Sequence, residues 1–140
     1  LPTRPGPVLY SASRMYQSPE QDSHPPAAAS NDAALLWDML DAAKAIAQFV
    51  SVKSFRDYNH DRLLRNAVER NIELIGLAAG GISSGFQAAN PEIPWRGLVV
   101  QRDALLAGQA ALDHKKMWVA ASEFIPYLVT TLTAVIPSAL

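Results

Sequence analysis

Apolar residues recur at spacings of three and four residues in four separate parts of this chain. That periodicity is typical of amphipathic helices, and no part of the sequence alternates with period two for long enough to predict a strand. The predicted helices cover about 32–50, 58–82, 95–108 and 113–136. Because short connections join them, the fold class that we predict is all-α, an up-and-down four-helix bundle.

Several residues at the ends of these segments are typical of helix boundaries. The side-chain oxygens of residues 30–32 can accept the free amides of the first helix. Gly80 and Gly108 indicate the ends of the second and third helices. Pro126 lies inside the fourth predicted helix and should kink or split it at the preceding residue.

The first part of the chain differs sharply in composition from the rest. Six of the ten prolines lie before residue 31, among serine, glutamine and alanine. Proline lacks a backbone donor and disfavours helix at the residue before it, so this part should be extended or irregular. We therefore predict a proline-rich tail or linker over 1–31 and one helical domain over 32–140.

Composition excludes several classes of protein and site. The chain has 140 residues and a formal net charge of -1, which gives no overall electrostatic signature for nucleic acid or anionic membrane. There is no cysteine, which excludes disulfides, thiolate metal sites and cysteine nucleophiles, and suits a cytoplasmic protein. No apolar run approaches the roughly 18 residues needed to span a membrane, so we expect no membrane association.

Arg102 interrupts the apolar stripe of the third predicted helix. Apolar pairs at 98–99 and 105–106 lie one turn on either side of it, so a charged side chain lies in the middle of an apolar face. A guanidinium keeps its charge in proteins, and must therefore be paired or lie in a cleft or subunit interface. One interpretation is a phosphate-binding arginine in a cleft. The other is a structural salt bridge with Glu73, Asp41 or Asp38.

The remaining polar residues carry weaker signals. His24, His60 and His114 have no metal-ligand spacing beyond the adjacent Asp113-His114 pair, and no glycine-rich phosphate loop is present. We therefore predict no metal and no cofactor. The most basic stretch is interleaved with three acidic residues and is interpreted as a solvated helix face; its cations are Lys53, Arg56, Arg62, Arg65 and Arg70.

Three motifs in the helical part point to one known family. The run 65–78 (RNAVERNIELIGLA) resembles the second-helix signature of the HepT-like toxins, in the HEPN superfamily. The segment 90–96 (NPEIPWR) is similar to the Pro-x-Ile-Pro-Trp start of that family's catalytic helix. Trp118 and the segment 126–128 (PYL) match its last helix. The resemblance covers roughly residues 33 to 136.

The resemblance implies a specific activity and specific partners. Such proteins are dimeric, metal-independent ribonucleases that act as toxins. A minimal nucleotidyltransferase antitoxin encoded beside them can silence them by adding AMP to a tyrosine. Their Arg-x4-His-x-Tyr motif follows the Pro-Trp pair, and two dimer-related motifs build one cleft. The arginine would hold the scissile phosphate, and the histidine would move the proton of the attacking ribose hydroxyl.

Carrying this motif onto the sequence retains the arginine and loses the rest. Arg102 takes the arginine position, whereas Ala107 stands at the histidine and Gln109 at the tyrosine. Asp103 replaces an asparagine, and Leu77 replaces a glutamate of the second helix. An alanine methyl group cannot move a proton, and Gln109 offers no phenol for AMP. His114 could replace the missing base only if the fold brought it to Arg102.

Three functional hypotheses follow. The favoured one is a catalytically degenerate HepT-like domain of a toxin–antitoxin system that forms a homodimer and binds a nucleotidyltransferase, with RNA binding doubtful. The second is an active metal-independent toxin endoribonuclease that uses a displaced base. The third is a plain helical interaction module, or a substrate-binding subunit for a nucleotidyltransferase.

Overall fold

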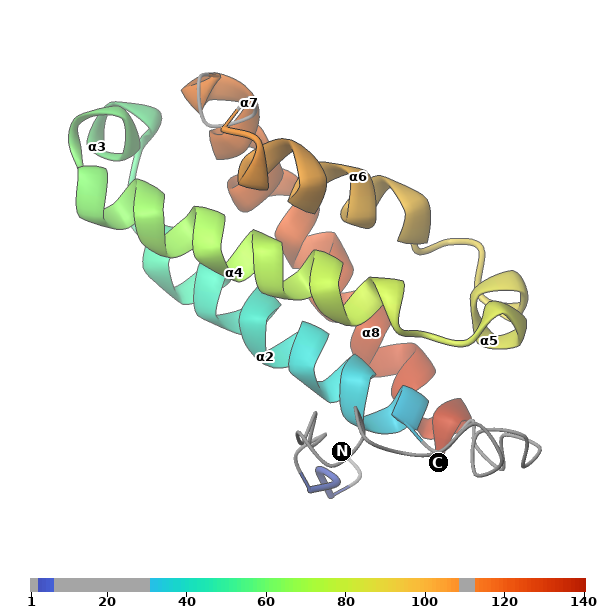
Figure 1. Ribbon diagram of the computed structural model, residues 1–140. Helices are drawn as coiled ribbons and strands as arrows, with labels where there is room; N and C mark the ends of the chain where they lie inside the picture. The colour runs from blue at the N-terminus through green and yellow to red at the C-terminus, as the bar shows by residue number, and fades with distance from the viewer. Residues whose placement is uncertain (1–2, 7–30, 109–112) are drawn as a thin grey trace.

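The structure is a computed structural model that describes residues 3–6, 31–108 and 113–140. Within these ranges all regular secondary structure is helical, as Figure 1 shows. The helices are α2 (Asp32–Val50), α3 (Phe55–His60), α4 (Arg62–Gly80), α5 (Ser84–Ala89), α6 (Trp95–Leu106), α7 (His114–Val119), the π-helix η4 (Ala120–Phe124), α8 (Ile125–Val135) and the 3-10 helix η5 (Ile136–Ala139).

The long helices run up and down alongside one another. Helix α4 packs against both α2 and α6, and α8 packs against α2, so that α2 and α4 form the centre of the bundle. Helices α3 and α7 lie together at one end, and α5 lies at the other (Figure 1). The predicted all-α bundle is confirmed.

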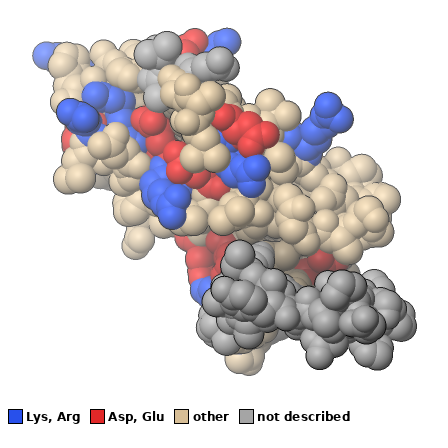
Figure 2. Space-filling model, in the orientation of Figure 1, with Lys and Arg blue, Asp and Glu red and all other residues tan. Residues whose placement is uncertain are grey.

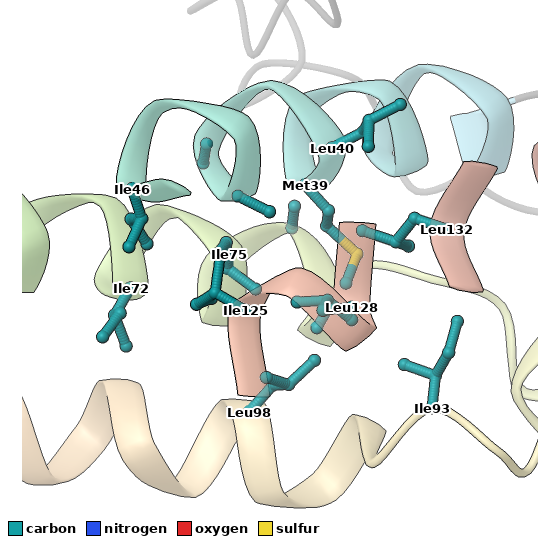
Figure 3. Close-up of a cluster of buried hydrophobic side chains, with 14 of the residues drawn as sticks. Met39, Leu40, Ile46, Ile72, Ile75, Ile93, Leu98, Ile125, Leu128 and Leu132 are labelled. Carbon is teal, nitrogen blue, oxygen red and sulfur yellow. The ribbon is translucent and has the colours of Figure 1, made fainter. Parts of the chain in front are cut away.

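The predicted apolar stripes form one core. Figure 3 shows Met39 and Ile46 of α2 pointing toward side chains of α4, α6 and α8. The stripe predicted for α4 is buried throughout; its members are Leu64, Val68, Ile72, Ile75 and Ala79. Phe49 is the exception on α2, because it lies in the last turn and its side chain remains 37% exposed.

The second predicted helix is two helices that meet at Asp61. This residue has extended backbone (φ -120°, ψ 97°), and its carboxylate accepts the amide of Leu64 at 3.1 Å, which starts α4 anew. Before it, Ser54 and Asp57 form a capping box that starts α3. These two caps therefore divide into α3 and α4 a region that apolar periodicity alone predicted as one helix.

Helix α5 was not predicted, and one buried contact holds it in place. The carboxylate of Asp32 accepts the backbone amide of Ser83 at 2.9 Å and its hydroxyl at 2.5 Å. Ser83 in turn caps α5. The Asp32 side chain, expected among the caps of the first helix, thus ties the start of α2 to the connection between α4 and α6.

The last predicted helix is continuous, but it contains one wide turn. Residues 120–124 form a π-helix immediately before Pro126, which lacks the amide that an α-helix would need there. The wide turn accommodates Pro126 without a break in the helix, so α8 continues directly from α7 through η4. The predicted break at Pro126 is therefore a change of helix type.

The uninterrupted helix His114–Ala139 is long and apolar enough, by length and composition alone, to cross a membrane. The sequence pattern did not indicate this span, because Pro126 divides its apolar run. Within the bundle, one side of it is fully buried against the other helices; the residues on that side include Met117, Ala121, Ile125, Leu128 and Leu132. Only 33% of its most apolar stretch is buried, so the helix packs along one stripe and leaves its other side partly exposed.

Gly76 allows α4 and α6 to approach closely. A Cβ atom at this position would lie 2.5 Å from the Cβ atom of Arg102 and 2.6 Å from the carbonyl oxygen of Leu98. Both of these atoms belong to the rigid part of α6, so neither can move aside without moving the helix. The contact therefore requires glycine, although glycine weakens a helix interior.

We expect Gly76→Ala to destabilise the protein by about 1–3 kcal/mol, because the added methyl group must push α6 away from α4. Urea denaturation would measure the change. Gly80→Ala is the matched control on the same helix, since its Cβ atom would only reach Val99 Cγ2 at an ordinary 3.6 Å. An equal loss of stability in both variants would contradict the contact.

Candidate functional site

The stem of Arg102 lies between two helices, and its guanidinium folds back onto its own helix. The Cβ atom faces Gly76 of α4. The Nε and Nη2 atoms donate to Asp103 Oδ1 at 3.2 and 2.9 Å. The Arg102 side chain is 27% exposed, so most of it is covered, although the charged end reaches the surface. The prediction that Arg102 lies on the packed side of α6 is confirmed.

The predicted ion-pair partners of Arg102 were wrong. Glu73 pairs with Arg70 at 3.4 Å, and both Asp38 and Asp41 pair with Arg4. The adjacent Asp103 is the carboxylate that reaches the guanidinium. Because Asp103 is adjacent to Arg102 in the chain, this ion pair does not depend on the orientation of a second helix. From the sequence, Asp103 was noted only as the replacement of an asparagine.

The position expected to carry a histidine lies at the exposed end of α6. Ala107 is the C-cap residue, and Gly108 adopts a left-handed conformation (φ 76°) that ends the helix where the sequence predicted. Leu106, assigned to the apolar face, is instead 66% exposed, whereas the preceding Leu105 is buried. Gln109 lies outside the described residues.

Leu77 does not face Arg102. It follows Gly76 on α4, and its side chain is 53% exposed. It lines a groove between α2 and α4, on the other side of α4 from the contact with α6. The position at which the family resemblance expects a glutamate therefore presents an apolar surface here.

His114 is held by α3. Its Nδ1 atom lies 2.8 Å from Asn59 Oδ1, and its ring packs edge-on against Tyr58 with centroids 6.4 Å apart. Arg65 fixes the backbone around Asn59 by donating to the carbonyl oxygens of Tyr58 and Asn59 at 3.2 and 2.7 Å. These contacts connect the start of α7 to α3 and α4, which the sequence pattern did not predict.

Burial dominates the ionisation of this second cluster. It raises the pKa of Tyr58 to about 12, and the charge of Glu69 adds to that shift. Burial also raises the pKa of Glu69, against the opposing effects of His114 and Arg65. Among the described residues no group accepts a hydrogen bond from the Tyr58 hydroxyl. The cluster is therefore a packed set of polar contacts between α3, α4 and α7 rather than an open pocket.

The basic stretch is largely solvated, as predicted. Figure 2 shows positive and negative side chains intermingled over the half of the visible face that carries α3 and the adjoining helix ends. Asp57 and Asp61 have their carboxylates engaged as helix caps among these cations. Arg65 is the exception, because its guanidinium binds backbone carbonyl groups.

The other polar candidates do not join Arg102. His60 contacts the carbonyl oxygen of Arg56 at 2.8 Å on exposed α3, and His24 lies outside the described residues. Over the ranges that the structure covers, no three histidine or carboxylate groups lie close enough to hold a metal ion. The candidate site thus consists of Arg102 and Asp103, with Ala107 one turn beyond Asp103.

Spectrophotometric titration should show Tyr58 ionising near pH 12. The pKa of Tyr58 in the folded protein exceeds the ordinary value of 10.0. The free energy of unfolding therefore contains a contribution from neutral Tyr58 that is fully present below pH 10 and is lost as the pH rises toward 12. Tyr58→Phe should remove the late absorbance step and delay alkaline unfolding. The exposed Tyr127 provides the control: Tyr127→Phe should keep the late step, and its loss there would refute the assignment.

Comparisons with known proteins identify the family of this chain. The family described as "Ribonuclease HepT-like" matches residues 39–135. A Thermococcus cleftensis protein named "Probable ribonuclease HepT" is 34% identical over 93 residues, which are 66% of this chain and 84% of that protein. A "Putative RNase" of Methanocaldococcus jannaschii is 28% identical, over 66% of this chain and 85% of its own length. No solved structure matches the chain.

The family match runs from α2 into the last residue of α8 and includes the α4–α6 contact at Gly76 and Arg102. It covers more than half of the chain, and the relatives align over most of their own length. The resemblance read from the sequence motifs is therefore confirmed. This chain belongs to the HepT-like ribonuclease family of the HEPN superfamily.

Proposed function

We propose that this protein is a HepT-like domain that does not cleave RNA by the family's route and acts through assembly with partners. The observation that carries the proposal is Ala107 at the end of α6, where the family motif places its histidine. Attack by a ribose hydroxyl on phosphorus requires a group that accepts a proton. A methyl group cannot do so, and loss of a positioned general base lowers rates by about 10²–10⁴.

The state of Arg102 supports the same conclusion. A phosphate-binding arginine must offer its guanidinium donors to the ligand. Here Nε and Nη2 both donate to Asp103 Oδ1, and the Asp103 carboxylate would also repel a phosphate beside it. RNA binding would therefore have to displace an ion pair and overcome a negative charge.

His114 does not supply the missing base in this proposal. Its Nδ1 atom contacts Asn59, and its ring packs against Tyr58, so its side chain is directed to α3. To reach a phosphate held by Arg102 it would have to leave both contacts. The alternative of an active ribonuclease with a displaced base therefore gains no support from the geometry.

Purified protein in EDTA should cleave labelled RNA no faster than buffer does. The restored variant Asp103→Asn/Ala107→His/Gln109→Tyr should cleave it at least about 10²-fold faster than the parent, because it regains a proton carrier and frees Arg102. Adding Arg102→Ala to that variant should abolish the gain. Robust cleavage by the parent protein that Arg102→Ala removes would overturn the proposal.

We further propose a homodimer in which two α6 helices face one another. Val100 lies one turn before Asp103 and Ala107 one turn after it, so they share an outward face of α6. Val100 is 55% exposed and the nearby Leu106 more so. Apolar side chains around a partly covered ion pair suit a subunit interface, which would bring two Arg102 residues into one cleft.

Sedimentation equilibrium should detect a dimer that Val100→Glu/Leu106→Glu converts to monomer, because each copy would place charges against the other. Leu63→Glu is the matched control, since Leu63 is also an exposed apolar residue but lies at the start of α4. A parent protein that is monomeric at high concentration, or a dimer unaffected by the double substitution, would contradict this interface.

A minimal nucleotidyltransferase is the partner that the family resemblance implies, and we propose that this cytoplasmic domain binds it without being modified by AMP. Gln109 has no phenol to accept the nucleotide. Co-expression with a nucleotidyltransferase encoded beside this chain should therefore give a complex whose helical subunit keeps its unmodified mass. The Gln109→Tyr variant should gain the mass of one AMP group, and failure of both proteins to associate would refute the partnership.

A further inference from the structure

Arg4 spans two carboxylates of α2 from a segment far away in the sequence. Its Nη2 atom donates to Asp38 Oδ1 at 2.7 Å, and its Nη1 atom pairs with Asp41. Asp38 and Asp41 are three residues apart on α2 and therefore lie on the same face. One guanidinium thus uses two different nitrogens to bind two carboxylates.

Arg4 reaches these carboxylates across a groove between α2 and α4. The groove encloses about 360 Å³, and Arg4 is one of its lining residues. Its other walls are mainly apolar; they include Leu35, Ala42, Leu74, Leu77 and Ala78. Asn71 adds one amide side chain to the α4 wall. The groove therefore combines an acidic rim with an apolar floor, and Arg4 supplies the complementary charge at the rim.

The chemistry of the segment suits such a groove. Thr3, Arg4, Pro5 and Gly6 have no regular secondary structure, and Pro5 restricts the backbone beside Arg4. A segment that is already restricted loses less entropy when it docks. A planar guanidinium can donate to two carboxylates at once, which the compact ammonium group of lysine does less well.

We propose that the acidic rim of the α2–α4 groove is a recognition site for an extended arginine-proline segment, and that Arg4 of the segment 3–6 of the same chain engages it. Arg4 forms one wall of this groove, on the side of α4 away from Arg102, and Leu77 in the α4 wall remains 53% exposed. Any partner that binds through Asp38 and Asp41 must therefore first displace Arg4. This inference does not depend on whether the domain cleaves RNA.

The absence of cysteine from the chain allows a direct test on the whole 140-residue chain. A nitroxide attached to a Thr3→Cys variant should broaden the amide signals of α4 around Leu74 and Leu77. Replacing both carboxylates with Asp38→Asn/Asp41→Asn should lower the ratio of docked to free segment roughly five- to tenfold, as expected for the loss of two partly exposed ion pairs. Glu92→Gln, which removes an exposed carboxylate elsewhere, should change nothing.

Two further variants separate recognition from general electrostatic attraction. Arg4→Lys keeps the charge, and should weaken the broadening if the planar guanidinium is what the groove recognises. Arg4→Glu should abolish the broadening, and adding Asp38→Arg/Asp41→Arg should restore it by reversing both charges. Unchanged chemical shifts of the core amides would confirm that each variant is folded.

Three results would overturn the proposal. The first is a parent protein without selective broadening at α4, and the second is broadening that survives loss of both carboxylates. The third comes from mixing spin-labelled chains of natural isotopic abundance with unlabelled 15N chains. Broadening that arises only between different molecules in this mixture would show that the groove does not hold its own segment.

Discussion

The close contact of α4 with α6 at Gly76 determines most of what this domain can do. Without a side chain at Gly76, the backbone of α6 comes near enough for Leu98 and Arg102 to rest directly on α4. The stem of Arg102 is thereby covered, while its guanidinium emerges at the edge of the helix pair. A polar group is thus placed in a predominantly apolar helix surface without being fully buried, which would be very costly.

That placement makes the fold independent of the residue at position 107. The packing depends on Gly76, on the Arg102 stem and on the apolar residues of α4 and α6. It does not depend on Ala107, which lies exposed at the helix end. A residue outside the core can change with little effect on stability. In this family member the ion pair with Asp103 satisfies the charge that the packed arginine stem brings to the surface.

Apolar periodicity was sufficient to predict the four helical segments, because the core is built from side chains that repeat every three to four residues. It could not reveal the break at Asp61, because the apolar stripe continues across the residue that caps and restarts the helix. It could not reveal α5 either, because the position of α5 depends on Asp32, fifty-one residues before Ser83.

At the site, the sequence predicted that Arg102 would lie on the packed side of α6, but not which carboxylate would reach it. A choice among Asp38, Asp41, Glu73 and Asp103 depends on how the helices are rotated in three dimensions. Gly76 could have indicated the close approach of α4 and α6, since a glycine inside a helical stripe often has a packing reason. The contacts of His114 with Asn59 and Tyr58 had no comparable signal in the local sequence.

The π-helix at 120–124 has a consequence for the register of the last helix. A π turn accommodates one more residue than an α turn, so it sets the rotation of α7 relative to α8. Removing one residue there would turn α7 by about 100° about its axis while α8 stayed seated. Met117 would then rotate out of the core and His114 away from Asn59. The extra residue of the π turn therefore fixes the rotation of α7 relative to α8 about their common axis.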